Sequence, residues 1–296
     1  MIIDLHTHTT ISDGIYSPEE LIRKAIAYKL AVLCITDHNA INPDLPMLRR
    51  KYPQIELPSG CEFSCNYTTI EGRVIQLHIG GIGFNQEDDE ILRVIRHNQD
   101  SMRGYIEKIL YKLKTNCNIN LCTYDELLSR NTSSQTVGRK HLAAEMVRQG
   151  ICKDIDEAFD IYLSNRNGIE RPAYVSNALK FAPLEEVVHA VIYAGGIASI
   201  CHLFEYFINY QLSEGEEKAM LSDFKQLAGN RGAIEVYYSS YAGMQMYYLK
   251  KTARKYDLLW SAASDYHGDG KVRQLGAYPY EVYERMLEAM RKDPFA

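Results

Sequence analysis

The chain has 296 residues, of which 46% are hydrophobic and 24% are charged, so its composition is that of a folded protein and excludes global disorder or a collagen-like repeat. Its formal net charge of −5 gives it no general basic surface for gripping duplex DNA. Short nucleotides and single-stranded ends remain compatible with this charge wherever positive side chains are concentrated locally.

The segment after Met1 has no basic stretch, apolar core and cleavage site of a secretory signal. The seven cysteines are an odd number and are scattered, which indicates reduced thiols rather than a disulfide framework. We therefore expect a cytoplasmic protein with neither a membrane nor duplex DNA as a partner.

The first 85 residues alternate short apolar segments with a helix. Strands are expected at Ile2–Leu5 and Ala31–Thr36, and the sequence Ser17-Pro18-Glu19-Glu20 between them is a strong helix start, with Ser as the cap and Glu at the third position. Two further strands are expected near Ser59–Phe63 and Arg73–Gly80. Strands that alternate with helices favour parallel pairing and an α/β architecture.

Residues 86–172 have a different pattern and are predicted to form an all-helical insertion. Helical periodicity runs from Asp88 to about Lys114, and Thr123-Tyr124-Asp125-Glu126 forms a second capping box. Two more amphipathic helices are expected at Val137–Gln149 and Asp154–Leu163. Residues 1–85 and 173–296 would then form one domain, which the insertion interrupts.

The α/β alternation returns after the insertion. A helix ending near Ala194 is expected before a strand at Ile197–Cys201. The rest of the chain is predicted to form, in order, a helix, a strand, a helix, a strand and a helix, at residues 216–227, 233–238, 244–256, 258–264 and 280–291.

Histidines and carboxylates gather at the predicted strand ends. His6-x-His8 and Asp265-x-His267 both have the two-residue spacing that places side chains on the same face of an extended segment. The complete set at strand ends and in the loops that follow them is His6, His8, Asp13, His38, Glu62, His78, His202, Asp265 and His267. In parallel barrels, catalytic residues collect at the carboxyl ends of the strands.

This set predicts a metal centre. A single histidine at a strand end usually makes only an ordinary hydrogen bond, but two His/Asp pairs far apart in the sequence, with further histidines between them, are hard to obtain by chance. Imidazole and carboxylate without thiolate are typical of an open catalytic site for manganese, iron or zinc. Six histidines and three carboxylates are too many for one ion and suit two or three.

The motifs resemble those of the PHP (polymerase and histidinol phosphatase) domain family. They occur in the family's order, from Leu5-His6-Thr7-His8 and Ile35-Thr36-Asp37-His38-Asn39, through Gly60-x-Glu62, Gln76-Leu77-His78 and Cys201-His202, to Ser264-Asp265-Tyr266-His267-Gly268. The likeness covers essentially the whole chain. It implies a distorted seven-stranded (β/α) barrel with an α/β fold and a trinuclear metal site at its C-terminal rim.

The resemblance also implies which residues hold which ion. One ion would be bound by His6, His8, Glu62 and Asp265, and a second by Glu62 with His78 and His202. A third would be bound by Asp13, His38 and His267. The implied reaction is hydrolysis of a phosphate ester by a metal-bound hydroxide.

The residues themselves favour the same chemistry. A nucleophile elbow and a Cys/His pair are both missing from the sequence, so covalent catalysis has little support. Clustered divalent ions activate water and polarise a phosphoryl oxygen. We interpret Asp265, His38 and His267 as catalytic; either histidine could protonate the leaving group, although a metal-bound histidine is a poor acid and a metal-bound water is the alternative.

The insertion contains Gly138-Arg139-Lys140-His141-Leu142-Ala143, Tyr162 and Arg171-Pro172-Ala173-Tyr174-Val175. In these motifs it resembles the subgroup that removes phosphate from nucleoside monophosphates or trims RNA from its 5′ end. The resemblance implies that Arg139 and His141, which open a helix, reach the substrate phosphate as part of a substrate-binding cap. Arginine binds phosphate in a bidentate manner, and a helix N-terminus favours anions, so the physical argument agrees. Arg171 is assigned the same role. Tyr174, or one of the tyrosines in Tyr237-Tyr238, is a candidate for stacking on a base.

The main prediction is thus a metal-dependent phosphoesterase that uses two or three Mn, Fe or Zn ions on a small nucleotide, such as 5′-AMP or a 3′,5′-bisphosphate. Exonucleolytic trimming of short single-stranded RNA and a histidinol-phosphate-type phosphatase are the alternatives among enzymes. A non-catalytic PHP scaffold is the alternative from another class, and the complete set of nine ligand positions argues against it.

Overall fold

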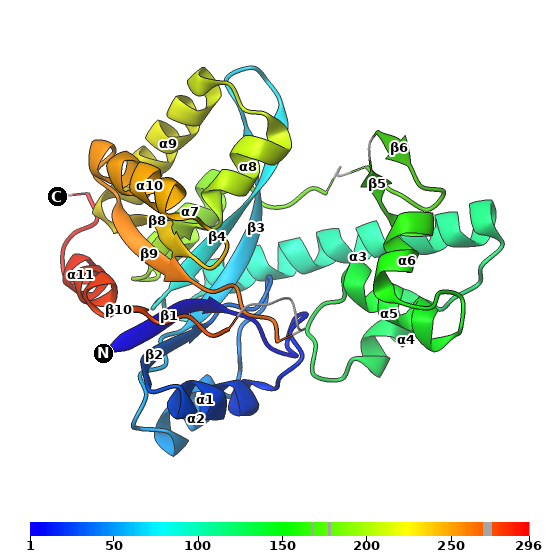
Figure 1. The fold of residues 1–296 in the computed structure, drawn as a ribbon, viewed down its shortest axis with the longest axis horizontal. Coiled ribbons are helices and arrows are strands. Elements are labelled where there is room, and N and C mark those ends of the chain that lie inside the picture. The colour runs from blue at the N-terminus through cyan, green and yellow to red at the C-terminus, as the bar shows by residue number, and fades with distance from the viewer. Residues whose placement is uncertain (167, 177–178, 269–273, 296) are drawn as a thin grey trace. The chain divides into compact units, whose positions relative to one another are not determined.

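The computed structural model describes residues 1–166, 168–176, 179–268 and 274–295, and it divides into two compact units. The first comprises Met1–Ile95 with Phe181–Ala296, and the second comprises Arg96–Lys180. Each unit is described separately below (Figure 1). In the described part of the chain, every helix is too short or too polar to cross a membrane.

The first unit contains a three-stranded sheet with the order β10-β1-β2. Its strands are β1 (Ile2–Thr7), β2 (Leu30–Ile35) and the short β10 (Tyr278–Pro279). β1 runs parallel to β2 and antiparallel to β10. Leu33 and Cys34 of β2 are fully buried, which explains the continuous apolar sequence of this strand.

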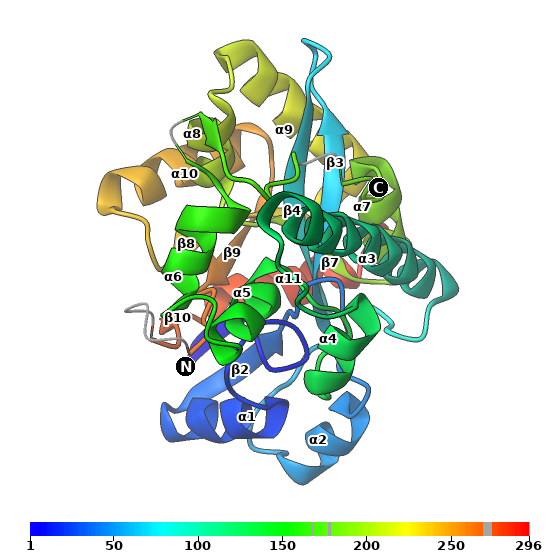
Figure 2. The same ribbon diagram turned by 90° about the vertical axis from the view of Figure 1, so that its right-hand side faces the viewer.

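A five-stranded sheet with the order β3-β4-β7-β8-β9 completes the first unit. It contains β3 (Gly60–Thr68), β4 (Val74–Ile82), β7 (Ile197–Ile200), β8 (Gly232–Tyr238) and β9 (Leu259–Ala263). The pairs β7–β8 and β8–β9 are parallel, but β3–β4 and β4–β7 are antiparallel, which corrects the expectation of parallel pairing throughout. Only a short turn joins β3 to β4, and such a turn permits antiparallel pairing alone. The long β3–β4 hairpin is visible in Figure 2.

Isolated bridges connect the two sheets along two seams. Thr7 pairs with Tyr266 beyond the end of β9, and Val32 pairs with Glu56 ahead of β3. The second seam also contains a bridge between His38 and Glu62. Strands and helices alternate along the chain as expected. The strands, however, form two sheets that are joined only by these bridges among the described residues, and not one continuous sheet.

Helices flank the sheets of the first unit. They are α1 (Pro18–Ala27), α2 (Leu45–Lys51), the start of α3 (Asp89–Cys117), α7 (Leu184–Tyr193), α8 (Leu203–Tyr210), α9 (Glu214–Ala228), the 3₁₀ turn η2 (Gly229–Arg231), α10 (Gly243–Lys255) and α11 (Glu281–Met290). The predicted capping box of α1 is confirmed, because Ser17 and Glu20 cap each other's backbone N–H groups. The sequence analysis missed α2 and α8.

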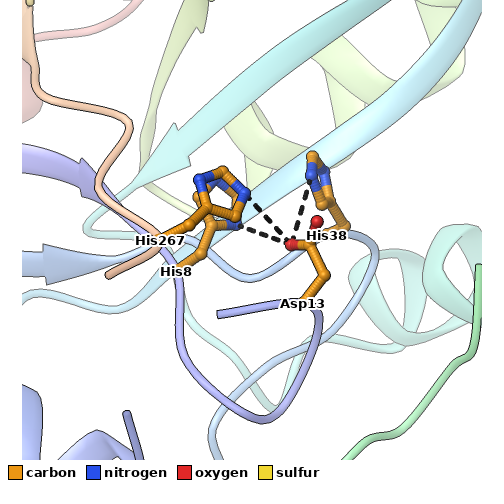
Figure 3. Close-up of side chains that lie close together, drawn as sticks. All are labelled: His8, Asp13, His38 and His267. Carbon is orange, nitrogen blue, oxygen red and sulfur yellow. Dashed lines mark ion pairs between the residues drawn. The ribbon is translucent and has the colours of Figure 1, made fainter. Parts of the chain in front are cut away.

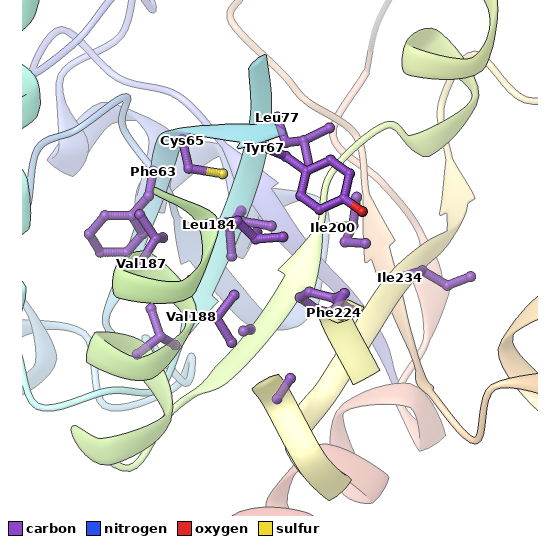
Figure 4. Packing of buried hydrophobic residues seen from close by; sticks show 14 of the residues in the cluster. Phe63, Cys65, Tyr67, Leu77, Leu184, Val187, Val188, Ile200, Phe224 and Ile234 are labelled. Carbon is purple, nitrogen blue, oxygen red and sulfur yellow. The ribbon is translucent and has the colours of Figure 1, made fainter. Parts of the chain in front are cut away.

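The largest apolar cluster lies between α7, α9 and the five-stranded sheet. Leu184 and Val188 of α7, Phe224 of α9 and Phe63 of β3 are all buried there (Figure 4). Tight packing of this kind fixes the sheet and therefore the strand ends that carry the histidines.

The second unit is built mainly of helices. Besides most of α3, it contains α4 (Tyr124–Arg130), α5 (Arg139–Arg148), α6 (Ile155–Ala158) and the π-helical turn η1 (Phe159–Leu163). It is not all-helical as expected, because β5 (Asn165–Arg166) and β6 (Ile169–Glu170) pair in an antiparallel manner. Gly168 has φ +73°, a backbone conformation that allows the tight connection between these strands. The compact unit spans residues 96–180, whereas the predicted insertion spans 86–172.

Candidate metal centre

Seven of the nine predicted ligands lie at the carboxyl ends of β1, β2, β7 and β9 or in the loops that follow: His6, His8, Asp13, His38, His202, Asp265 and His267. Glu62 and His78 instead lie inside β3 and β4. The expectation that these two residues end their strands is therefore wrong. The reason is that β3 continues past Glu62 to the hairpin turn, whereas β4, which is antiparallel to β3, continues past His78 to Ile82.

The first group of donor atoms surrounds the two histidines of β1. The Nε2 atoms of His6 and His8 are 3.0 Å apart. Glu62 Oε2 lies 3.4 Å from the first and 3.3 Å from the second. Asp265 Oδ1 approaches His8 Nε2 to 3.2 Å. These four side chains thus converge on one point from three different strands.

The carboxylate of Glu62 connects this group with further histidines. Its Oε1 lies 2.8 Å from His78 Nδ1 and 3.1 Å from His202 Nε2. Its Oε2 lies 2.8 Å from His38 Nδ1. The Glu62 side chain is only 1% exposed, so one buried carboxylate is shared by imidazoles from several strands.

A further group surrounds Asp13, in the loop after β1 (Figure 3). Asp13 Oδ1 lies 3.1 Å from His267 Nε2 and 3.7 Å from His38 Nε2. His8 contributes its Nδ1 at 4.0 Å, while its Nε2 faces the first group. His8 therefore stands between the two groups, and its ring stacks on that of His267 with centroids 4.1 Å apart.

The chemistry of the donors fits metal ions better than a hydrogen-bonded network. His8 Nδ1 and His202 Nδ1 are buried and, among the described residues, have no hydrogen-bond partner. Buried polar atoms are normally satisfied, so such a concentration of unsatisfied atoms requires an explanation. The donor atoms of three sets of side chains lie close enough together to share an ion. These sets are His8/Asp13/His38/His267, His38/Glu62/His78 and His6/His8/Asp265.

The surroundings of His8 and His38 shift the pKa values of these two histidines in opposite directions. Burial, together with the neighbouring His267 and His38, lowers the pKa of His8 to about 3, so its imidazole is neutral at pH 7. Burial alone would lower the pKa of His38, but the carboxylates of Glu62 and Asp13 outweigh it and raise that pKa to about 9. Neutral imidazoles and ionised carboxylates are the forms that bind metal.

Glu235 is a functional candidate that the sequence analysis missed. This residue of β8 is 2% exposed, and its Oε1 lies 2.7 Å from His6 Nδ1. Its Oε2 accepts a hydrogen bond of 2.6 Å from the backbone N–H of His202. A carboxylate on the far nitrogen of a ligand histidine fixes the tautomer and the ring orientation. An acidic residue within the apolar strand sequence Ala233–Tyr238 was the available signal.

Two buried aspartates hold the loops that carry predicted ligands. Asp4 accepts the backbone N–H groups of Ser264 at 3.0 Å and Gly276 at 2.7 Å, which fixes the segment containing Asp265. Asp37 accepts hydrogen bonds from Thr9 and Ser12 in the loop before Asp13. Burial raises the pKa of Asp4 to about 6.

Two of the predicted ligands have a left-handed backbone. His202 has φ 32° and Asp265 has φ 56°, although neither is glycine. Such conformations cost about 1–3 kcal/mol each and cluster at functional sites. At both positions the chain turns sharply as it leaves a strand, and the side chain is thereby directed toward Glu62 or His8.

The predicted substrate-binding residues all belong to the second unit. Arg139 opens α5 and lies over the ring of Phe159 at 5.7 Å, and the Nδ1 of His141 accepts the N–H of Gly138 at 3.2 Å. Arg171 is half-buried, and the carbonyl of Tyr174 accepts a hydrogen bond from Lys112. The assignment of these residues to the substrate phosphate and base stays a prediction.

Curated relatives span nearly the full length of the chain. A 5′-3′ exoribonuclease from Haemophilus influenzae is 29% identical over 265 residues, which cover 89% of each protein. A 3′,5′-nucleoside bisphosphate phosphatase from Chromobacterium violaceum is 29% identical over 273 residues, covering 91% of this chain and 88% of that protein. One relative is thus named for the degradation of RNA from its 5′ end, and the other for the removal of phosphate from a nucleoside bisphosphate.

Solved structures share the fold. A Chromobacterium violaceum protein described as an amidohydrolase, with bound sulfate and no metal, matches with a TM-score of 0.73 and 26% identity, covering 96% of this chain and 97% of that one. A Bifidobacterium adolescentis protein described as a metal-dependent phosphoesterase matches with a TM-score of 0.76 and 23% identity, covering 96% and 95%. The PHP domain family model matches residues 4–284. The chain therefore belongs to the PHP domain family, and the resemblance carried by its motifs, with the phosphoester hydrolysis that it implies, is confirmed.

Proposed function

We propose that the nine clustered side chains hold two or three divalent ions and that the protein hydrolyses phosphate monoesters of small nucleotides. His6, His8, Glu62 and Asp265 would hold the first ion, and Glu62, His78 and His202 the second. Asp13, His38 and His267 would hold the third. The observation that carries the proposal is the sharing of one buried carboxylate, Glu62, by histidines of several strands.

Divalent ions in these positions supply an activated water and neutralise the charge that develops on a phosphoryl group. Residues of the chain would hold the metal ligands in position. Asp265 reaches the first group through Oδ1, and its Oδ2 accepts a hydrogen bond of 2.8 Å from the Tyr238 hydroxyl. Tyr238 thereby fixes the carboxylate of Asp265.

His38 or His267 would protonate the leaving alkoxide if it is not bound to metal; a metal-bound histidine is a poor acid, and water would then supply the proton. The side chain of His38 is 29% exposed, so it stands at the open side of the centre, whereas His8 is fully enclosed. Its pKa of about 9 means that the imidazole carries a proton at pH 7 when it is not bound to metal. His267, at 13% exposure, is the more enclosed of the two candidates.

The relatives and residues of the second unit support the proposed substrate class. The Chromobacterium violaceum relative is named a phosphatase of nucleoside bisphosphates, which agrees with a small nucleotide such as 5′-AMP or a 3′,5′-bisphosphate. Arg139, His141 and Arg171 would bind the substrate phosphate, and Tyr174 would stack on the base. A guanidinium is suited to this role because it binds phosphate through two parallel hydrogen bonds.

A second candidate activity is trimming of short RNA from its 5′ end. It is favoured by relatives of similar coverage that are named 5′-3′ exoribonuclease, in Haemophilus influenzae and in Escherichia coli. The chemistry at the phosphorus is the same, and only the leaving group is longer.

The test combines metal analysis with phosphate release. The purified protein is loaded with Mn²⁺, its bound metal is counted, and release is then measured from AMP, adenosine 3′,5′-bisphosphate, histidinol phosphate and a short 5′-phosphorylated RNA. Two or three ions per chain and fast release from a nucleotide are expected. Release from histidinol phosphate alone would overturn the substrate class, and absence of bound metal would overturn the assigned centre.

A further inference from the structure

A row of aromatic rings leads away from the metal centre. The ring of Tyr238 lies 6.0 Å from that of His202, and the ring of Tyr241 lies 4.8 Å from that of Tyr238. Phe204, near the start of α8, then contacts Tyr241 at 5.4 Å and Tyr248 of α10 at 5.5 Å between ring centroids. We call Phe204, Tyr241 and Tyr248 the aromatic wall.

The aromatic wall is held in place and is accessible. The hydroxyl of Tyr241 accepts a hydrogen bond of 3.1 Å from the backbone N–H of Phe204, which ties the loop before α10 to the start of α8. Phe204 and Tyr241 are half-buried, and Tyr248 is 45% exposed. Partly exposed aromatic rings of this kind can stack on a flat ligand.

Helix α10 continues from the wall and is unusually basic for this acidic protein. Its sequence contains Lys250, Lys251, Arg254 and Lys255 and no acidic residue, whereas the whole chain has a net charge of −5. Lys251 and Lys255 are exposed and follow Tyr248 by three and seven positions, so they share its helix face. Glu214 of α9 interacts electrostatically with Lys255, but its carboxylate is paired with Lys218 at 2.5 Å.

Proteins that bind single-stranded nucleic acid combine aromatic rings, which stack on bases, with exposed cationic side chains, which contact the phosphates. Every base has a flat face, so stacking is tolerant of sequence, and lysines neutralise the backbone phosphates. Phe204 of the aromatic wall is two residues from His202 in the sequence. Tyr238, whose ring contacts that of Tyr241, donates a hydrogen bond to Asp265. The position next to the assigned metal centre makes a nucleotide chain a better fit than an unrelated ligand.

We propose that the aromatic wall stacks on a base beyond the first nucleotide of a short single strand, a base that AMP lacks, and that Lys251 and Lys255 bind the phosphates that follow. This inference rests on the proposed function and extends it. It makes a short 5′-phosphorylated oligonucleotide a better substrate than a mononucleotide, because only the longer ligand reaches α10.

The experiment compares two substrates and two kinds of variant. KM is measured with Mn²⁺ for AMP and for a 5′-phosphorylated RNA tetranucleotide, in wild type, Tyr248→Ala and Lys251→Ala. Stacking of one base corresponds to about a tenfold effect on binding. We therefore expect KM for the tetranucleotide to rise about tenfold more than KM for AMP in Tyr248→Ala. The control is Tyr193→Ala, in α7, whose side chain is 69% exposed and whose removal should change neither value.

Direct binding separates this inference from the proposed function. Fluorescence anisotropy of a labelled tetranucleotide gives Kd without turnover, and the salt dependence of Kd should become less steep in Lys251→Ala because one phosphate contact is lost. Weaker binding in Tyr248→Ala supports the wall even if wild type releases no phosphate. Unchanged Kd in both variants, or an equal rise of KM for both substrates, overturns the inference while leaving the phosphoesterase proposal intact.

Discussion

At the scale of single residues, the candidate centre depends on side chains with two different neighbours. Glu62 faces His78 and His202 with one oxygen and His38 with the other. His8 faces Asp265 with Nε2 and Asp13 with Nδ1. Because each connects two groups of donors, replacing either should affect more than one ion.

Replacement of Asp265 tests the centre most directly. We expect Asp265→Ala to reduce kcat at least about a thousandfold, because a carboxylate that reaches both His8 and His267 is lost. The measurement is phosphate release, accompanied by a thermal melt that shows the fold to be retained. His189→Ala, in α7, is the matched control and should behave like wild type. An Asp265→Ala protein with wild-type turnover would refute the site.

Glu235 is expected to act through His6 rather than on substrate. Glu235→Gln keeps the shape but removes the charge beside His6 Nδ1, so the affinity for metal should fall about 10–100-fold. The affinity is measured by metal titration, and excess Mn²⁺ should restore turnover. Glu185→Gln, on the exposed side of α7, is the control. Lost turnover that excess metal does not restore would contradict a positioning role.

At the scale of elements, the β3–β4 hairpin is fastened to α9 by one ion pair. Arg73, in the turn of the hairpin, donates to both oxygens of Glu216 in the first turn of α9. Thr69 of the same turn also hydrogen-bonds Glu216. Since β3 and β4 carry Glu62 and His78, this contact supports the sheet on which the centre is built.

This ion pair predicts a pH dependence of stability. Hydrogen bonds from Arg73 and Thr69 lower the pKa of Glu216 from 4.5 to about 2. A carboxylate with a lowered pKa stabilises the fold above its ordinary pKa, and this contribution disappears as pH falls from about 4.5 to about 2. The free energy of unfolding of wild type should therefore decrease over that range. Denaturant titrations should show a smaller decrease for Glu216→Gln, and an identical decrease in both proteins would exclude this contact as the cause.

At the scale of the whole molecule, the sequence predicted the alternating architecture and the strands of the candidate centre, because their apolar runs and histidine spacing are local signals. It missed α2 and α8, which are short, and the antiparallel pairing of β3 with β4. It also missed Glu235, because a single acidic residue in a strand shows its partners only after the strands have paired. Long-range pairing decides such contacts, and no local pattern encodes them.

The proposed role of Arg139 in binding the substrate phosphate is tested through kinetics. Arg139→Ala should raise KM for a phosphate substrate about tenfold with little change in kcat, because a charge-assisted hydrogen bond to phosphate contributes to binding. Lys140→Ala, the next position of α5, controls for a general loss of positive charge and should have a smaller effect. If Arg139→Ala has wild-type kinetics on every substrate, the residue is only a surface charge.

The order in which the chain is synthesised has a consequence for assembly. His6 lies in β1, and the end of this strand pairs on one side with β2 but on the other with the segment from Asp265 to Tyr266, more than 250 residues later. Domains acquire structure while the ribosome extends the chain from its N-terminus. We therefore expect nascent chains arrested before Asp265 to retain little metal, whereas chains extended past His267 acquire it, which metal analysis of the two truncated products would measure. Metal loading would then follow the synthesis of the segment that carries Asp265 and His267.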